Sequence, residues 1–291
     1  MVTELLIKKI KQNKKYTSLS DALVEKEIVS FLNRNPQLKK DHLKKSEMIK
    51  IIKEVRKILH RFYASYQTKK KYGREEILAD LLGGIEKRDE KIIKESVKEI
   101  LSTTLATKER LDNYETVYKK IFAITGQPRV IVDLGAGLNV FSFPFMNLKS
   151  LTHYAYDIDE KDIKFLNNYL YLMQPIGLEG SAEILDIRTC DPELFPDSDM
   201  VFMFKLIDLI DTKKKKYSRS IIKDLFEKNK TLFVVASFAT RTLSRKKMNL
   251  PKRVGFEKML AQLNLSFMSF STNNEIFYII SSQYKLDNKL G

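Results

Sequence analysis

After Gln127-Pro128, short apolar runs of strand length alternate with segments of helical periodicity, and few folds satisfy this alternation. Strands joined by helices predict a parallel sheet with helices on both faces. Only residues 271–275 separate the last two runs, too few for a crossover, so we expect a terminal antiparallel hairpin. The seven predicted strands are Val130–Leu134, His153–Tyr156, Ala182–Leu185, Met200–Phe204, Leu232–Ser237, Leu265–Phe270 and Ile276–Ile280.

The chain before about Thr125 has a helical pattern instead. Its clearest helix carries apolar residues at i, i+3, i+4 and i+7 from Met48 to Phe62, with lysines and arginines on the other face. We predict an all-helical N-terminal domain of residues 1–105 and an α/β domain of residues 106–291. Further expected helices are Leu5–Ile10, a Ser20-capped helix to Leu32, Glu75–Leu82, Glu90–Leu101 and a Thr107-capped helix to Ile124. We expect the helices to be interrupted at Asn33–Pro36 and at Gly83-Gly84, and we expect a loop at Lys69–Gly73.

The positive charge of the chain is concentrated near its N-terminus. The formal net charge is +15, and residues 1–100 hold 25 Lys and Arg against 15 Asp and Glu. Release of counterions makes a polyanion such as nucleic acid the natural partner of this surface. General solubility in a lysine-rich proteome is the alternative explanation.

Cysteine and histidine are scarce. Cys190 is the only cysteine, which excludes an intramolecular disulfide, and three scattered histidines do not suggest a metal cluster. The N-terminal residues lack the apolar core and cleavage site of a signal peptide, and no uncharged apolar run approaches a membrane span. We therefore expect a cytoplasmic protein without metal or membrane attachment. The sequence leaves the oligomeric state open, and we favour a monomer.

The run Val130–Gly137 predicts a strand that enters a glycine turn. Gly135 and Gly137 allow unusual backbone angles and a close approach to a ligand. Asp133 ends the strand, and Asp157 follows 24 residues later at the end of the next one, where a carboxylate can accept hydrogen bonds from ribose hydroxyls. In the alternative interpretation, the two acids only cap helices.

The third glycine of the dinucleotide fingerprint is replaced by Val140. The small residue that seats a pyrophosphate is therefore missing, and S-adenosylmethionine (SAM) contains no phosphate. Five strand–helix units that end in a hairpin are also typical of SAM-dependent methyltransferases. We predict a Rossmann-like, seven-stranded SAM-dependent methyltransferase domain with SAM as cofactor.

Several blocks, in order, resemble the aminoglycoside-resistance methyltransferases that modify guanine N7 in the decoding region of small-subunit ribosomal RNA. The glycine motif is generic, whereas the Thr-x-Glu-Arg, Lys205 and Ser-Phe-x-Thr-Arg blocks are specific to the family. The matching blocks are Leu59–Tyr66, Thr107-Lys-Glu-Arg-Leu111, Asp133-Leu-Gly-Ala-Gly-Leu-Asn139, Phe202-Met-Phe-Lys-Leu206 and Val235–Ser244.

The resemblance implies a set of cofactor contacts. Arg110 would bind the SAM carboxylate, as the shape of a guanidinium allows, and Asp157 would bind the ribose. Asp186 and Ile187 would frame the adenine, and Tyr66 would close over the cofactor. A surface ion pair for Arg110 and simple packing for Tyr66 are the alternatives. Further cofactor-binding residues implied are Thr107, Asp133, Gly135, Ala136, Gly137, Phe204 and Leu206.

Some positions depart from the family pattern, mostly where the target would bind. Ala239 replaces a proline, and the glycine-rich stretch after Leu243 becomes Ser244-Arg-Lys-Lys-Met248. The residues after Asn139 also differ, and the tryptophan before Phe256-Glu257 is absent. The identity of the modified nucleotide is therefore less constrained than the cofactor.

Guanine N7 carries a free lone pair, so its methylation requires alignment but no general base. Lys205, at the end of the fourth predicted strand, is the residue we expect to orient the base, with a solvated strand-end lysine as the alternative. Two alternative functions stay open: methylation of another structured RNA, and binding of SAM and RNA without turnover in ribosome assembly. The sequence also does not decide between a role in drug resistance and a housekeeping role. The residues expected to contact RNA phosphates are Arg241, Arg245, Lys246 and Lys247.

Overall fold

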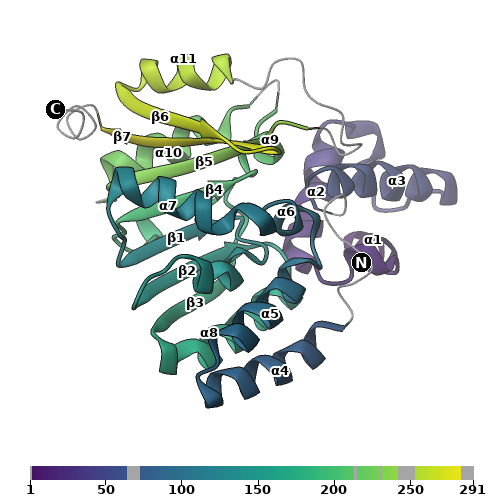
Figure 1. Ribbon diagram of the computed structural model, residues 1–291. Helices are drawn as coiled ribbons and strands as arrows, with labels where there is room; N and C mark the ends of the chain where they lie inside the picture. The colour runs from purple at the N-terminus through teal and green to yellow at the C-terminus, as the bar shows by residue number, and fades with distance from the viewer. Residues whose placement is uncertain (1, 64–72, 213–214, 230, 242–252, 283–291) are drawn as a thin grey trace.

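The computed structural model describes residues 2–63, 73–212, 215–229, 231–241 and 253–282 of the 291-residue chain. A seven-stranded sheet with the order β3-β2-β1-β4-β5-β7-β6 forms its centre (Figure 1). The strands β1 to β5 pair in parallel, and β7 pairs antiparallel with β5 and β6, which confirms the predicted hairpin. The strands are β1 (Val130–Leu134), β2 (Leu151–Asp157), β3 (Leu178–Ile184), β4 (Met200–Phe204), β5 (Phe233–Ala239), β6 (Leu265–Ser271) and β7 (Glu275–Ser282).

The accuracy with which the sequence predicts the bounds of a strand depends on how deeply the strand is buried. All five residues of β4 are buried, as in a central parallel strand covered on both faces, and its bounds match the prediction. The edge strand β3 begins four residues before the predicted run, because its first half contains Glu179 and Gly180. Gly180 has a φ of +133°, and a Cβ there would lie 2.0 Å from the carbonyl oxygen of His153. Contact with β2 therefore requires glycine in this strand.

Two apolar cores lie between the sheet and its helices. One joins α4, α5, α7 and α8 to one face of the sheet, and the other joins α9, α10 and α11 to the opposite face. A third cluster is formed by α1, α2 and α3, which lie together at one side of the sheet (Figure 1). The helices are α1 (Val2–Lys11), α2 (Asp21–Asn33), α3 (Lys45–Phe62), α4 (Arg74–Lys87), α5 (Glu90–Leu101), α6 (Leu105–Lys108), α7 (Tyr114–Thr125), α8 (Glu160–Met173), α9 (Ile207–Ile210), α10 (Tyr217–Glu227) and α11 (Val254–Gln262).

The packing differs from the predicted division at residue 105. The apolar faces of α4 and α5 belong to the same core as β1 and β4, whereas only α1–α3 have a separate core. Periodicity shows that a helix has an apolar face but not which surface that face covers. We name α1–α3, residues 2–63, the helical unit, and place α4 and α5 with the sheet.

Two local helix predictions are wrong. Gly83-Gly84 does not interrupt the helix, because both glycines lie inside α4. A Cβ at Gly84 would lie 2.9 Å from Cγ2 of Ile92 in α5. Gly84 therefore permits close packing of α4 on α5. The expected helix from Thr107 to Ile124 is divided into α6, a 3₁₀ turn (Leu111–Asn113) and α7. Thr107 is no cap, since its buried hydroxyl donates a hydrogen bond to the carbonyl oxygen of Leu101.

Candidate functional site

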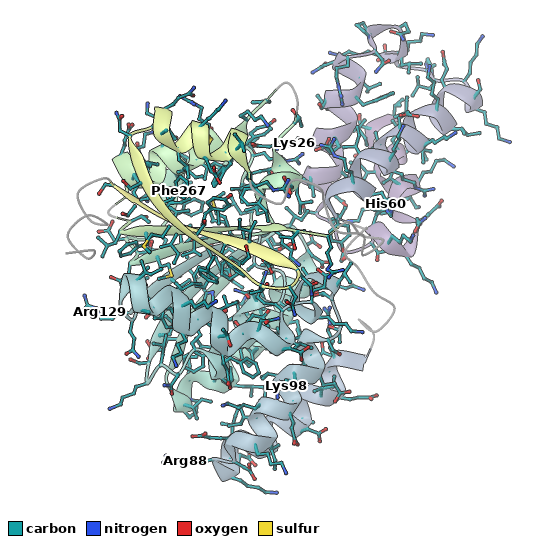
Figure 2. The ribbon with its side chains drawn as sticks, turned by 45° about the horizontal axis from the view of Figure 1, so that its top comes forward. Lys26, His60, Arg88, Lys98, Arg129 and Phe267 are labelled. Atoms are coloured by element: carbon teal, nitrogen blue, oxygen red, sulfur yellow. The ribbon has the colours of Figure 1, made fainter. Side chains whose placement is uncertain are left out.

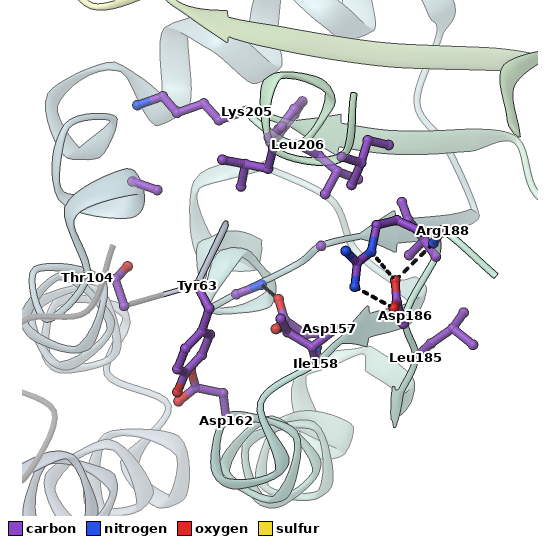
Figure 3. Close-up of a pocket in the computed structure, with 17 residues that line it drawn as sticks. Tyr63, Thr104, Asp157, Ile158, Asp162, Leu185, Asp186, Arg188, Lys205 and Leu206 are labelled. Atoms are coloured by element: carbon purple, nitrogen blue, oxygen red, sulfur yellow. Dashed lines mark hydrogen bonds and ion pairs between the residues drawn. The ribbon is translucent and has the colours of Figure 1, made fainter. Parts of the chain in front are cut away.

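A pocket lies at the carboxyl ends of β1 to β4, where ligands bind in open α/β sheets. The turns after these strands form most of its wall, and Tyr63, Thr104 and Ala106 complete it from the N-terminal side (Figure 3). The predicted site residues that line it are Gly135, Gly137, Asp157, Asp186, Ile187, Phe204, Lys205 and Leu206.

The glycine turn after β1 has the expected conformation. Gly135 and Gly137 have φ values of +68° and +52°, a region that side chains disfavour. A Cβ on Gly135 would lie 2.7 Å from Cδ1 of Leu206, so glycine also lets the turns after β1 and β4 approach each other. The Gly137 N–H donates to Oδ2 of Asp157 at 2.8 Å, which joins the turn to the end of β2.

Asp157 presents a carboxylate to the pocket from the end of β2. The backbone N–H of Ile158 donates to its Oδ1 at 2.7 Å. Burial, together with the nearby carboxylates of Asp162 and Asp159, raises the pKa of Asp157 to about 6, against the opposing effect of the backbone donors. A half-buried carboxylate on the wall of a cavity can accept hydrogen bonds from a pair of hydroxyl groups.

Asp186 follows β3, the strand next to β2, and is held by two cations. Arg188 donates to it through Nε at 2.8 Å and Nη2 at 2.7 Å (Figure 3), and Lys26 of α2 also donates to it. Burial opposes ionisation of Asp186, but the two cations prevail and lower its pKa to about 2. Arg188 forms a further ion pair of 2.8 Å with Glu27. These contacts bind the helical unit to the rim of the pocket.

Tyr63 extends this attachment on the other side of Asp157. Its hydroxyl donates to the carboxylate of Asp159, and Ser18 donates to the same oxygen at 2.9 Å. Burial and the Asp159 charge raise the pKa of Tyr63 well above its usual value. Tyr63 is not among the predicted site residues, although it lies within the matching block that ends at Tyr66. Tyr66 itself lies outside the described residues.

Lys205 lies in a turn directly after β4, with a φ of +55° that is uncommon for a residue with a side chain. Its backbone N–H donates to Oγ of Ser237 at 3.0 Å. Its side chain is only 6% exposed, and its ammonium group is 2.7 Å from Oε2 of Glu109 and 3.8 Å from Oε2 of Glu275. The alternative of a solvated strand-end lysine is therefore wrong.

Arg110 is in a buried ion pair rather than on the pocket wall. Its Nε and Nη2 donate to the two oxygens of Glu275 at 3.1 and 2.7 Å, and Nη1 donates to Asn139 at 3.1 Å. Burial opposes the charges of both groups, but their attraction raises the pKa of Arg110 and lowers that of Glu275. The alternative of a surface ion pair is wrong, and a contact of Arg110 with a cofactor stays a prediction.

Three other residues that were predicted to bind the cofactor do not line the pocket but lie behind its wall. Asp133 is 1% exposed and accepts a hydrogen bond of 2.8 Å from Asn139, which excludes the helix-cap alternative for its carboxylate. Thr107 faces the carbonyl of Leu101, and the Ala136 N–H donates to Tyr156 rather than into the pocket. These three residues shape the site from behind.

The predicted RNA contacts are mostly outside the described residues, which include neither Arg245, Lys246 nor Lys247. Arg241, two residues after β5, donates from Nε to the carbonyl oxygen of Asn273 at 3.3 Å. Within the described ranges, no group of three or more His, Cys, Asp or Glu side chains could hold a metal ion. No helix among these residues has the length and apolar character to span a membrane.

Comparison with known proteins gives a consistent result. A family model described as "Ribosomal RNA methyltransferase (FmrO)" matches residues 41–279. The chain is 31% identical over 258 residues to a 16S rRNA (guanine(1405)-N(7))-methyltransferase of Proteus mirabilis, covering 79% of this chain and 83% of the relative. It is 22% identical over 232 residues to the enzyme with this name from Micromonospora echinospora, covering 79% and 81%.

Solved structures share the fold over nearly the whole length. The 16S rRNA methyltransferase RmtF, in complex with S-adenosyl-L-homocysteine, has a TM-score of 0.73 and 18% identity, with 97% of this chain and 98% of that one covered. The 16S rRNA methylase RmtB has a TM-score of 0.69 and 20% identity with the same coverage. Both matches include the helical unit.

Proposed function

This chain belongs to the ribosomal RNA methyltransferase (FmrO) family, and we propose that it transfers the methyl group of SAM to N7 of a guanine in 16S ribosomal RNA of the small subunit. The target follows the names of its relatives, which specify guanine 1405. The observation that carries the proposal is the pocket at the strand ends, where a glycine turn and a carboxylate converge.

The pocket residues fit SAM in chemistry and position. Asp157 would accept hydrogen bonds from the ribose hydroxyls, and Leu185 and Ile187 offer apolar surface beside Asp186 for the adenine. The backbone of Gly135–Gly137 leaves room for the methionine portion, and no phosphate has to be seated. When bound, SAM supplies an electrophilic methyl group on a positively charged sulfur.

In the reaction, guanine N7 attacks the methyl carbon with its lone pair. The new N–C bond forms as the C–S bond breaks, and the bonding electrons remain on sulfur. No proton is moved, so no residue has to act as a general base. The protein's task is therefore to align N7 with the methyl group and to exclude water. Lys205, on the pocket wall, would orient the base through its O6 atom.

The helical unit is the proposed RNA-binding surface. Residues 2–63 contain 16 Lys and Arg but only seven Asp and Glu. Several of these cations are exposed on one helix, α3, at one side of the sheet (Figure 2). Contacts of this kind hold the phosphate backbone and weaken with salt. The exposed cations of α3 are Lys45, Lys50, Lys53, Lys57 and Arg61.

The proposal is tested by incubating the full chain with SAM labelled in its methyl group and with isolated small or large ribosomal subunits. We expect label in the RNA of the small subunit alone. The Asp157→Ala variant should transfer little at limiting SAM. If the wild type binds S-adenosylhomocysteine but labels neither subunit, it is a binding protein without turnover; label in other RNA instead would contradict the proposed substrate.

Cofactor affinity should depend on pH through Asp157. Its raised pKa means that the carboxyl group of the free protein takes up a proton near pH 6, and only the ionised form accepts from both ribose hydroxyls. The dissociation constant of S-adenosylhomocysteine, measured by calorimetry, should therefore rise as pH falls, by about tenfold per pH unit below 6. Above about pH 7 it should be constant.

The matched control is Asp157→Asn, which keeps the shape but cannot ionise. It should bind more weakly at pH 8, by about 1–3 kcal/mol, with no rise between pH 7 and 5. If the wild-type affinity does not change between pH 7 and 5, binding of the ribose does not depend on the charge of Asp157.

A further inference from the structure

Lys205, on the pocket wall, forms an ion pair with Glu109 that uses only part of each group. The Lys205 side chain is 6% exposed, whereas that of Glu109 is 27% exposed. Within the part of the chain that the structure describes, Lys205 engages Oε2 of Glu109, and no hydrogen bond involves Oε1. An ammonium group has three N–H bonds and a carboxylate oxygen has two lone pairs. A donor and an acceptor therefore remain side by side for an incoming ligand.

We propose, on the basis of the proposed function, that Glu109 selects guanine at the target position together with Lys205. The Watson–Crick edge of guanine carries the acceptor O6 next to the donors N1–H and N2–H₂. Lys205 donates to O6, and Glu109 accepts from N1–H and N2–H₂. Enzymes that act on a base extruded from its stack read this edge by hydrogen bonds.

The two groups are held in place before a ligand arrives. Glu109 ends α6, with its backbone N–H bonded to the carbonyl of Leu105 at 3.1 Å, and Asn274 donates to the Glu109 carbonyl at 3.4 Å. Lys205 is held by Ser237 in its left-handed conformation. Such preorganisation reduces the entropy lost when the base binds.

Other bases place the wrong atoms against this pair. Adenine would direct its N6 amino group at the ammonium and the N1 lone pair at the carboxylate, so that both contacts would be repulsive. Uracil and cytosine lack N7. Selection therefore rests on rejection as well as attraction, as is usual for specific sites.

The test compares guanine with inosine, which keeps O6, N1–H and N7 but lacks the 2-amino group. Small subunits are reconstituted with 16S RNA that carries either base at the modified position, and single-turnover methyl transfer is measured. For the wild type we expect guanine to react faster by about tenfold or more, from one charged hydrogen bond. For Glu109→Ala both rates should fall, and the ratio of guanine to inosine should approach one.

Two variants serve as controls. Lys205→Ala should slow both substrates and keep the ratio, since O6 is common to both bases. Glu115→Ala, which changes a 67% exposed side chain in α7, should keep wild-type rates and ratio. Binding of S-adenosylhomocysteine to each variant reports folding. A wild type that leaves guanine subunits unmodified contradicts the proposed function, whereas a Glu109→Ala ratio equal to that of an active wild type overturns this inference alone.

Discussion

Lys205→Ala is expected to lower the single-turnover rate of methyl transfer on bound small subunits by about 100-fold, the scale of a small misalignment of reacting atoms. The ammonium group lies between two carboxylates at the pocket wall, and no proton has to be removed from N7. Alanine keeps the Cβ, so the left-handed backbone at this position is no more strained than before. The loss should therefore lie in the rate on bound substrate, with the affinity for S-adenosylhomocysteine little changed.

Arg241→Ala is the matched control for this effect. A phosphate contact holds the substrate equally in the ground and transition states, so this variant should raise KM and keep kcat. Rates measured from about pH 6 to 9 at saturating SAM should show no titration of an essential base in either variant. An unchanged rate for Lys205→Ala on bound subunits would exclude it as the residue that orients the base.

Glu275→Ala is expected to reduce the free energy of unfolding by about 3–5 kcal/mol, because removal of one partner leaves a buried charge uncompensated. Arg110 is 3% exposed, and both of its hydrogen bonds to Glu275 would be lost. Ser237, which donates to Glu275 and accepts from Lys205, would lose a partner as well. Urea unfolding followed by circular dichroism measures the change.

Glu109→Ala provides the comparison and should destabilise the protein less, since the Glu109 side chain is 27% exposed and Lys205 keeps Glu275 as a partner at 3.8 Å. Because the pKa of Glu275 is lowered in the folded protein, its contribution is present above the unfolded pKa and is lost as the pH falls through the folded value. The difference in stability between wild type and Glu275→Ala should therefore shrink in acid. Equal destabilisation by the two variants at pH 7 would show that the Arg110–Glu275 pair is not the dominant one.

The sequence predicts the sheet well, because buried parallel strands such as β4 are continuous apolar runs and the turns between them contain glycine or acidic residues. It predicts several pocket residues for the same reason, since Gly135, Asp157 and Asp186 lie at or just after the ends of strands that must meet at one edge. Contacts between residues far apart in the sequence could not be predicted in this way. The partner of Arg110 is Glu275, 165 residues later, and no local pattern connects them.

Helix packing is likewise not visible in a single sequence. The apolar face of α5 has clear periodicity, but periodicity does not show that this face packs in the sheet core or that Gly84 lets α4 approach α5. The predicted division at residue 105 therefore places α4 and α5 with the wrong core. Tyr63 has no distinguishing signal in the sequence, because an aromatic residue at the end of an amphipathic helix is usually a packing residue; only the fold places it on the pocket wall.

The central claim is tested most directly by finding the modified atom. Small subunits are incubated with the wild type and SAM, and their 16S RNA is treated with borohydride and aniline, which cleave at N7-methylguanine, before reverse transcription. The account predicts one new SAM-dependent stop that reports guanine 1405, the position in the names of the relatives. Transfer of labelled methyl groups to this RNA without aniline-induced cleavage would place the methyl on another atom and contradict the account.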